Sequence, residues 1–383
     1  TWTFLYRRMA LNPNYYNLQG TSHRHLSDHL SELVETTLEE LSTSKCIIVE
    51  DDEVSPLNLG MIAAYYYINY VTIEVFSVSV TAIKKLSALL QIVPAAAEFE
   101  DVPIRHHEDV VLRRIHDRLP VKTENPNFLD PHFKTNILLQ AHFSRVQLPP
   151  DLESDQKIVL VKVIRLIQAC VDVISSNGWL NPALFAMELC QMTVQAMWDR
   201  DSPLRQVPHL GADAIERLQK AGVEGVIDIM SMEDADRDKA LKLDQRRLAD
   251  VARYVNRYPN VDLAFDEMED AGKGKAAGPD VGPVIAPYYP AQKDEGWWVV
   301  VGHVASKSLL AIKRTTLRTR VNVKLDFSPP EGVTGKVACR LYLMCDAYSG
   351  VDQEYDFDIE VAEGEGSGES GDESGEEGDA MQE

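Results

Sequence analysis

Three histidines near the amino terminus, His23, His25 and His29, are residues of a type that binds metal ions. His25 and His29 are four residues apart and Glu32 follows one turn later, so on a helix these side chains would share one face, as zinc ligands can. The spacing brings no cysteine or carboxylate from outside that helix to the same face. We therefore interpret the histidines as part of a solvated helix start and predict no metal site.

The sequence lacks the motifs of ATP binding and of nucleophilic catalysis. The nearest string to a phosphate-binding loop, GKGK at residues 272–275, has neither a preceding strand nor the Ser or Thr that would bind magnesium. There is no H-E-x-x-H zinc motif and no nucleophile elbow. The pair His106 and His107, beside Arg105 and Glu108, fits a structural polar cluster at a helix start. The sequence thus predicts no catalytic residue and no cofactor in this chain.

A polar stripe interrupts the otherwise apolar helix predicted over residues 182–198. Glu188, Gln191 and Gln195 follow one another at intervals of three and four residues, which places them on one helical face. The stripe could be the exposed edge of a buried helix or a surface that faces nucleic acid. Because it carries no Lys or Arg, we favour the exposed edge.

Two further groups of residues could contact anions. A glycine-containing turn at residues 220–225 could present backbone N–H groups near Lys220, Gly222 and Gly225 to a phosphate. Glu224 opposes an anion there, so protein packing is the favoured role. Nearer the carboxyl terminus, basic residues on predicted strands form either the solvated side of a sheet or a docking face for an acidic partner or RNA: Lys313, Arg314, Arg318 and Arg320.

The charge of the chain argues against a broad nucleic-acid surface. The formal net charge of the 383 residues is -22. The segment from Glu360 onward has ten acidic residues and no basic one, which leaves -12 for the rest, whereas phosphate binding needs clustered Lys and Arg. Any RNA contact is therefore expected to be local and weak.

The five cysteines and the first residues indicate the compartment in which the protein works and how the chain begins. The cysteines are scattered, odd in number and without a C-x-x-C pair, which argues against a disulfide framework and a zinc site and favours a reducing compartment. The chain begins at Thr1 without a signal-peptide pattern, so we expect an excised fragment. The apolar stretch over residues 59–83 carries several polar side chains, so we predict a bundle helix there and no membrane span.

Hydrophobic periodicity predicts a multidomain protein that is mainly α with a C-terminal all-β domain. A helix over residues 24–41 precedes two short strands joined at Asp51–Asp52, which is the outline of a winged helix within residues 1–60. Helical periodicity broken by prolines predicts a helical bundle over residues 61–200. Short helices separated by glycine turns predict a helix-hairpin-helix module over residues 201–262.

The remaining residues change character after a polar, glycine-rich linker at 263–280. Runs with a period of two predict an antiparallel β-sandwich over residues 281–362, and its strands are WWVVVGHV, SLLAIKRT, RVNVKLDFS, KVACRLYLMC and EYDFDIEV. The acidic tail at 363–383 has almost no apolar residues, so we expect it to be disordered.

Several strings together resemble the Sec63 homology unit of large spliceosomal RNA helicases. They occur in the family's order over nearly the whole chain: TWTFLYRR, NPNYYNLQG, LNLGMIAAYYYINYVTIE, PIRHHED, KTNILLQAHFSR, RLIQACVDVISSNGWL, NPALFAMELCQM, GPVIAPYYP, EGWWVV and LYLMCDAYSGVDQEYDF. The resemblance implies a winged-helix remnant, a helical bundle, a helix-hairpin-helix and an immunoglobulin-like, fibronectin type III-like β-sandwich. It departs at DAGKGKAAGPDVGP, residues 270–283, where the family has another strand, so either the sandwich lacks an edge strand or the linker is unusual.

The resemblance also implies a function. In this family the bundle covers the helicase motor domains, which would bind ATP and magnesium, and one bundle helix lines a channel for single-stranded nucleic acid; residues 182–198 look like that helix. We expect a nuclear, non-catalytic platform that packs on the motor domains of its own polypeptide and on other spliceosomal proteins. The alternatives are a single-stranded RNA-binding module and, since the same unit occurs there, a subunit of endoplasmic-reticulum protein translocation.

Overall fold

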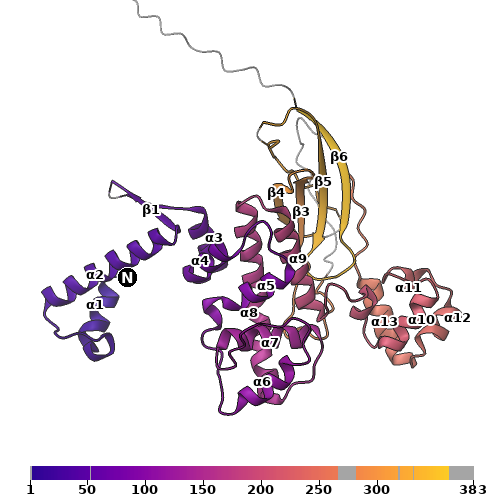
Figure 1. Ribbon diagram of the computed structural model, residues 1–383, viewed down its shortest axis with the longest axis horizontal. Coiled ribbons are helices and arrows are strands. Elements are labelled where there is room, and N and C mark those ends of the chain that lie inside the picture. Colours follow the sequence, from indigo (N-terminus) through magenta and orange to yellow (C-terminus); the bar gives the residue numbers. More distant parts are fainter. Residues whose placement is uncertain (1, 52, 266–281, 318–319, 331, 362–383) are drawn as a thin grey trace, which may run out of the picture.

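The computed structural model describes residues 2–51, 53–265, 282–317, 320–330 and 332–361. About half of the protein is helical, and it has two small antiparallel sheets. In Figure 1 the first helices lie to the left of a central helical bundle, the last helices lie to its right, and the larger sheet lies above it. The predicted division into a mainly helical part and a C-terminal β part is confirmed.

The N-terminal unit has two helices and a hairpin. Helices α1 (Trp2–Leu11) and α2 (His23–Thr43) are joined through the 3-10 turn η1 (Pro13–Tyr16), and strands β1 (Ile47–Glu50) and β2 (Glu53–Pro56) follow. Ser22 begins α2 because its hydroxyl accepts a hydrogen bond from the backbone N–H of His25. Met9, Leu26 and Leu30 form the small core between the two helices. The predicted helix and hairpin are confirmed.

The bundle is built around one long central helix. Helix α8 (Pro150–Ser176) packs against four others, α3 (Asn58–Tyr66), α4 (Tyr70–Ser79), α7 (Pro131–Phe143) and α9 (Leu180–Gln195). No helix in the described ranges is long and apolar enough to cross a membrane. The smaller elements of the bundle are α5 (Leu86–Ile92), η2 (Val93–Ala95), η3 (Ala97–Phe99) and α6 (Glu108–His116).

A buried ion cluster joins three parts of this bundle. The ammonium of Lys134 on α7 is inaccessible to solvent and lies 2.7 Å from both Glu108 and Asp155, and Arg105 bonds both carboxylates from the rim. A buried ammonium is tolerated because each charge has a partner of opposite sign. Arg105 and Glu108, which flank His106 and His107, therefore help to hold α6, α7 and α8 together.

The segment after the bundle folds into four short helices. They are α10 (Ala212–Lys220), α11 (Asp228–Ser231), α12 (Asp234–Leu241) and α13 (Gln245–Arg257), preceded by η4 (Pro203–Gln206). Asp244 caps α13 by accepting the N–H of Arg247. Leu218, Val223 and Val251 are among the buried residues that hold these helices together.

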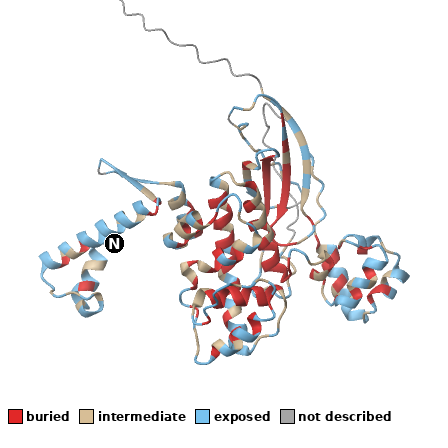
Figure 2. Ribbon diagram, in the orientation of Figure 1, coloured by how far each residue is buried: buried red, intermediate tan, exposed pale blue. Residues whose placement is uncertain are grey.

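The C-terminal sheet has four antiparallel strands in the order β4-β3-β5-β6. These are β3 (Trp297–His303), β4 (Ser308–Thr315), β5 (Gly335–Cys345) and β6 (Gln353–Val361). Trp298 and Val300 join the core of the bundle, whereas Trp297 and Val299 join a second core that includes α10 and α13. The continuous apolar run of β3 thus reflects burial on both faces, visible as the red strands of Figure 2.

One predicted strand is wrong. The run RVNVKLDFS at residues 320–328 keeps a period of two, with Val323, Leu325 and Phe327 half-buried, yet it joins no ladder. A period of two reports which way side chains face, whereas a strand also needs backbone partners. The described residues therefore contain one larger sheet, with extended chain against its second face. The linker residues 266–280, the departure before Gly282 and the acidic tail lie outside the described residues.

Candidate interaction surfaces

Helix α9 is held against the sheet from its first residue. Gly178 precedes it with φ +70, the left-handed region that favours glycine, and its carbonyl accepts the N–H of Leu309 at 2.8 Å. The N–H of Leu180 donates in turn to the carbonyl of Lys307. A Cβ at Gly302 of β3 would lie 2.4 Å from Leu180 Cδ2. This close approach of helix and strand requires glycine at that position.

The polar stripe of α9 faces the sheet instead of solvent. Gln191 and Gln195 are 4% and 1% exposed. Gln191 Nε2 donates to the carbonyl of Cys345 at 2.8 Å and to Asp352, and Gln195 Nε2 donates to the carbonyl of Ala347 at 2.8 Å. The preferred interpretation of the stripe as an exposed edge is therefore wrong for both glutamines. For either amide to face nucleic acid, the sheet would have to move away.

Glu188, the third residue of the stripe, is half-buried and lies among other carboxylates. Burial, together with the smaller effect of the charges of Asp352, Asp199 and Glu354, raises the pKa of Glu188 to about 7. Burial also raises the pKa of Asp352 to about 6, against the lowering effect of the hydrogen bonds from Gln191 and the Cys345 N–H. The stripe thus combines two amides that bind the sheet with one carboxyl that resists ionisation.

A single loop between β5 and β6, residues 346–352, receives most of these contacts. Asp346 has no exposed surface and binds Lys293 at 2.7 Å, Arg314 at 3.0 Å and the N–H of Gly296 at 2.9 Å. Ser349 exchanges two hydrogen bonds with the Gln206 side chain and accepts one from the Tyr258 hydroxyl. The β5–β6 loop therefore joins the bundle, the short helices and the sheet.

The backbone N–H groups of the turn between α10 and α11 are already bound by a carboxylate of the chain itself. The N–H groups of Glu224 and Gly225 both donate to Asp228 Oδ2, at 3.0 and 2.8 Å. Lys220 is paired with Glu216 at 2.6 Å, and Gly222 takes φ +83 at the turn. A phosphate at this turn would have to displace the carboxylate of Asp228. The geometry accordingly favours the packing role that the sequence indicated.

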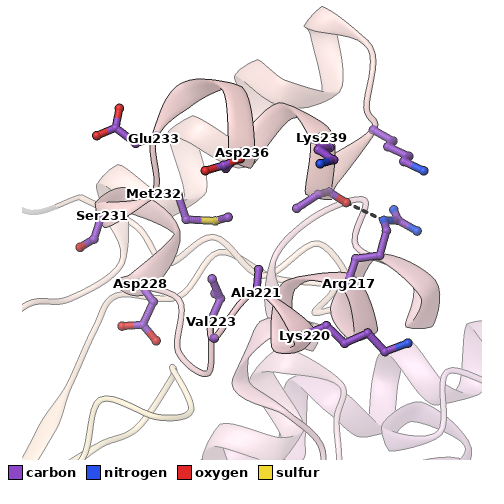
Figure 3. A pocket seen from close by; sticks show the side chains of 13 residues that line it. Arg217, Lys220, Ala221, Val223, Asp228, Ser231, Met232, Glu233, Asp236 and Lys239 are labelled. Carbon is purple, nitrogen blue, oxygen red and sulfur yellow. Dashed lines mark hydrogen bonds between the residues drawn. The ribbon is translucent and has the colours of Figure 1, made fainter.

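A groove of about 840 Å³ opens beside this turn, between α10, α11 and α12. Figure 3 shows Val223, Ala221 and Met232 near its middle, with Lys239 above and Lys220 below them on the right and Glu233 at the upper left. Arg217 does not offer its guanidinium freely because it donates to the carbonyl of Ala240. The groove therefore has charges of both signs around apolar side chains.

The residues predicted to form a basic face on the sheet have different roles in the structure. Arg314 binds Asp346 and lies over the ring of Trp298, 5.5 Å from its centroid. Lys313 is exposed and its ammonium donates to the carbonyl of Lys324, and Arg320 is exposed on the extended segment. Arg318 lies outside the described residues. Arg314 thus stabilises the β5–β6 loop, a role that the alternation of charges did not indicate.

The first 83 residues carry an apolar surface that the sequence did not indicate. The six most exposed large hydrophobic side chains in the described ranges all lie there and are 76% to 86% exposed: Leu11, Tyr15, Tyr65, Tyr67, Val78 and Ile83. Strands β1 and β2 also expose Ile48, Val49 and Val54, and the pale colour of this region in Figure 2 shows how little of it is covered. We call this the N-terminal apolar surface.

Candidate metal ligands and thiols are placed as follows. Among the residues with described positions, no three His, Cys, Asp or Glu side chains are arranged to hold a metal ion. His25 and His29 lie on α2, where His25 is exposed. All five cysteines are buried free thiols.

The sequence matches two family profiles, one for each part of the chain. The Sec63 Brl domain matches residues 56–358, and a winged helix-turn-helix domain matches residues 1–51.

Relatives with similar sequences are much longer proteins. The chain is 57% identical over 378 residues to the U5 small nuclear ribonucleoprotein 200 kDa helicase of Homo sapiens, and the match covers 95% of the chain and 18% of that protein. It is 54% identical to the Drosophila melanogaster protein of the same name, covering 97% and 18%. It is 45% identical to the pre-mRNA-splicing factor brr2 of Schizosaccharomyces pombe, covering 95% and 17%. The chain therefore spans less than a fifth of these relatives.

Proposed function

The chain belongs to the Sec63 Brl domain family, and on that premise we propose that it is the non-catalytic C-terminal part of a spliceosomal ATP-dependent RNA helicase. In this role it is a platform for protein interaction and regulation in pre-mRNA splicing. ATP and magnesium would bind the motor domains elsewhere in the same polypeptide. The names of the relatives, which include helicases and a pre-mRNA-splicing factor, support this assignment and a nuclear location.

The N-terminal apolar surface is the observation that carries the proposal. A two-stranded hairpin is marginally stable in water unless another element covers it, and β1 and β2 expose residues on both faces. Contiguous exposed apolar side chains mark contacts with other protein, and the exposed Val49 and Val54 are cross-strand neighbours on this hairpin. We assign this surface to the motor domains of the same polypeptide, which the lengths of the relatives leave room for.

The finer divisions of the fold are part of the same proposal. We assign residues 1–60 to a winged-helix remnant, 61–200 to the bundle, 201–262 to a helix-hairpin-helix and 281–362 to an immunoglobulin-like sandwich. The sandwich would consist of the four-stranded sheet with the half-buried chain at 320–327 covering its second face. The helix-hairpin-helix groove and the exposed Lys313 are the places where other spliceosomal proteins would dock.

The alternative as an RNA-binding module has less support from the contacts. Gln191 and Gln195 are engaged by the sheet, and Asp228 fills the turn that would hold a phosphate. Translocation at the endoplasmic reticulum is likewise less well supported, since the relatives named above are helicases and a splicing factor. RNA remains a weak partner in this proposal, and no membrane contact is part of it.

The test uses the purified chain and the separately expressed upstream part of its polypeptide. We expect the two to associate, and we expect Tyr67→Arg with Val78→Arg to abolish association while Met230→Arg, an equally apolar exposed site on α11, preserves it. In parallel, binding to fluorescent single-stranded RNA across a salt series should stay weaker than about 10⁻⁵ M, the non-specific range. Tight, salt-dependent RNA binding without association would overturn the platform in favour of the RNA-binding module.

A further inference from the structure

The contact between α9 and the β5–β6 loop places two carboxyl groups at one interface. Glu188 projects from the polar stripe of α9, and Asp352 ends the loop. Asp352 accepts Gln191 Nε2 at 3.0 Å and 2.8 Å on its two oxygens, and its Oδ1 also accepts the N–H of Cys345 at 2.8 Å. These hydrogen bonds fix Asp352 in place beside the helix that carries Glu188.

The charges around this pair are mostly of the same sign. Asp199 follows α9 in sequence, and Glu354 stands on β6. Arg340 of β5 pairs with Glu354 at 3.0 Å and with Asp356, so its charge is directed to those carboxylates. No Lys or Arg in the described ranges forms an ion pair with Glu188 or Asp352. Ionising both carboxyls therefore places two uncompensated charges at a half-buried interface.

We propose that the contact between α9 and the β5–β6 loop is a proton-dependent clamp, tight while Glu188 and Asp352 together hold a proton and looser when both are ionised. The clamp rests on contacts inside the chain, so it stands or falls independently of the proposed function. Its opening would uncover Gln191 and Gln195, the amides that the closed sheet covers.

The direction of the pH dependence follows from the raised pKa values. A carboxyl whose pKa is higher in the folded protein than in the unfolded chain binds more protons when folded. The closed clamp therefore loses stability as the pH rises from about 4, the unfolded value, through the folded values of about 6 and about 7. Above that window both groups are ionised and the loss is complete.

Backbone hydrogen exchange of residues 345–353 measures the clamp directly. After normalisation to an unstructured peptide at each pH, we expect the opening of this segment to increase about tenfold between pH 6.0 and 8.5, as a change of about one pKa unit in linkage requires. Glu188→Gln keeps the shape of the side chain and removes its charge, so the increase should fall below about twofold. Glu224→Gln, the same change on the exposed turn after α10, should leave the wild-type response intact.

Two results would overturn the clamp. One is a Glu188→Gln protein whose exchange responds to pH as the unmodified chain does. The other is a carboxyl carbon of Glu188 that titrates near pH 4 in the NMR spectrum of the unmodified chain, a measurement that decides the question even where the variant fails to fold. Titration of Glu188 near pH 7, with a flattened response in Asp352→Asn, would support it.

Discussion

Tyrosines are used in opposite ways in two regions of this molecule. On the N-terminal apolar surface Tyr65 and Tyr67 are 80% and 86% exposed. Beside the β5–β6 loop, Tyr348 packs its ring against Tyr254 and Tyr258 at 6.0 and 5.6 Å between centroids. The same side chain thus supports the fold where it is enclosed, whereas on the N-terminal apolar surface it is available to a partner. Substitutions in the two regions should therefore separate stability from binding.

The largest expected effect in the loop is the loss of Asp346. Asp346→Ala leaves Lys293, which is itself largely buried, and Arg314 without their shared carboxylate. Removing one partner of a buried ion pair costs about 3–5 kcal/mol, and the free energy of unfolding in urea should fall by that amount. Asp358→Asn, which breaks the exposed pair with Lys336, is the control and should cost less than about 1 kcal/mol. Equal losses in the two proteins would contradict the central role of the loop.

The close contact between α9 and β3 should be the next most sensitive. Gly302→Ala forces a Cβ against Leu180 Cδ2, and overpacking of this kind costs about 1–3 kcal/mol. Thermal unfolding should show the loss, and the double variant Gly302→Ala/Leu180→Ala should lose less stability than the two single changes added together, because the shortened side chain makes room. Gly225→Ala, whose Cβ would meet Asp228 Oδ2 at 3.6 Å, an ordinary contact, serves as the matched control.

A smaller loss is expected for the amide that binds Ala347. Gln195→Met keeps the length of the side chain but leaves the Ala347 carbonyl without its 2.8 Å donor. The net worth of such a hydrogen bond is about 1 kcal/mol, to be measured by urea unfolding. The half-buried Gln168 of α8 offers the comparison, since Gln168→Met should leave stability unchanged. A stabilised Gln195→Met protein would show that apolar packing matters more than the amide at this interface.

The smallest effect on stability is expected on the N-terminal apolar surface. Val78→Ser and Ile83→Ser alter side chains that are 76% and 85% exposed, and such surface changes usually stay within about 0.5 kcal/mol. Unfolding measurements should therefore give wild-type values, while association with the upstream part of the polypeptide weakens. Destabilisation above about 1 kcal/mol would mean that this surface contributes to the fold itself and would erase the contrast between the two regions.

The sequence predicted most helices and strands because their periodicity depends on one buried face. The single helix expected over residues 59–83 is wrong, since the chain there forms two helices, α3 and α4. The helix expected over residues 24–41 is α2, and the two-faced burial of β3 explains its unbroken apolar run. The covering of Gln191 and Gln195 could not be predicted, since a polar stripe on a helix does not reveal which carbonyls, over 150 residues away, will satisfy it. Asp228 had a local signal that we did not use: an acidic residue three positions after Gly225 can cap that turn.

The exposure of the apolar residues on the N-terminal apolar surface could not be predicted from the sequence either. Apolar side chains in a sequence predict burial, and Tyr65, Tyr67 and Val78 lie in strings that fit a bundle helix. They do lie on or beside bundle helices, but on faces that no described residue covers. The apolar type of a side chain indicates that it should be buried. It does not indicate whether the residues that bury it belong to the same domain or to a partner.

The long reach of the β5–β6 loop also sets an order of events on the ribosome. Gln191 binds Asp352, a residue made 161 positions later. At synthesis rates of about 5–20 residues/s the bundle waits roughly 10–30 s for this partner. During that interval the Gln191 side chain lacks this partner in the β5–β6 loop. The contact between α9 and the β5–β6 loop is therefore completed only when the loop has been translated, so a truncation before Asp352 leaves Gln191 without this partner.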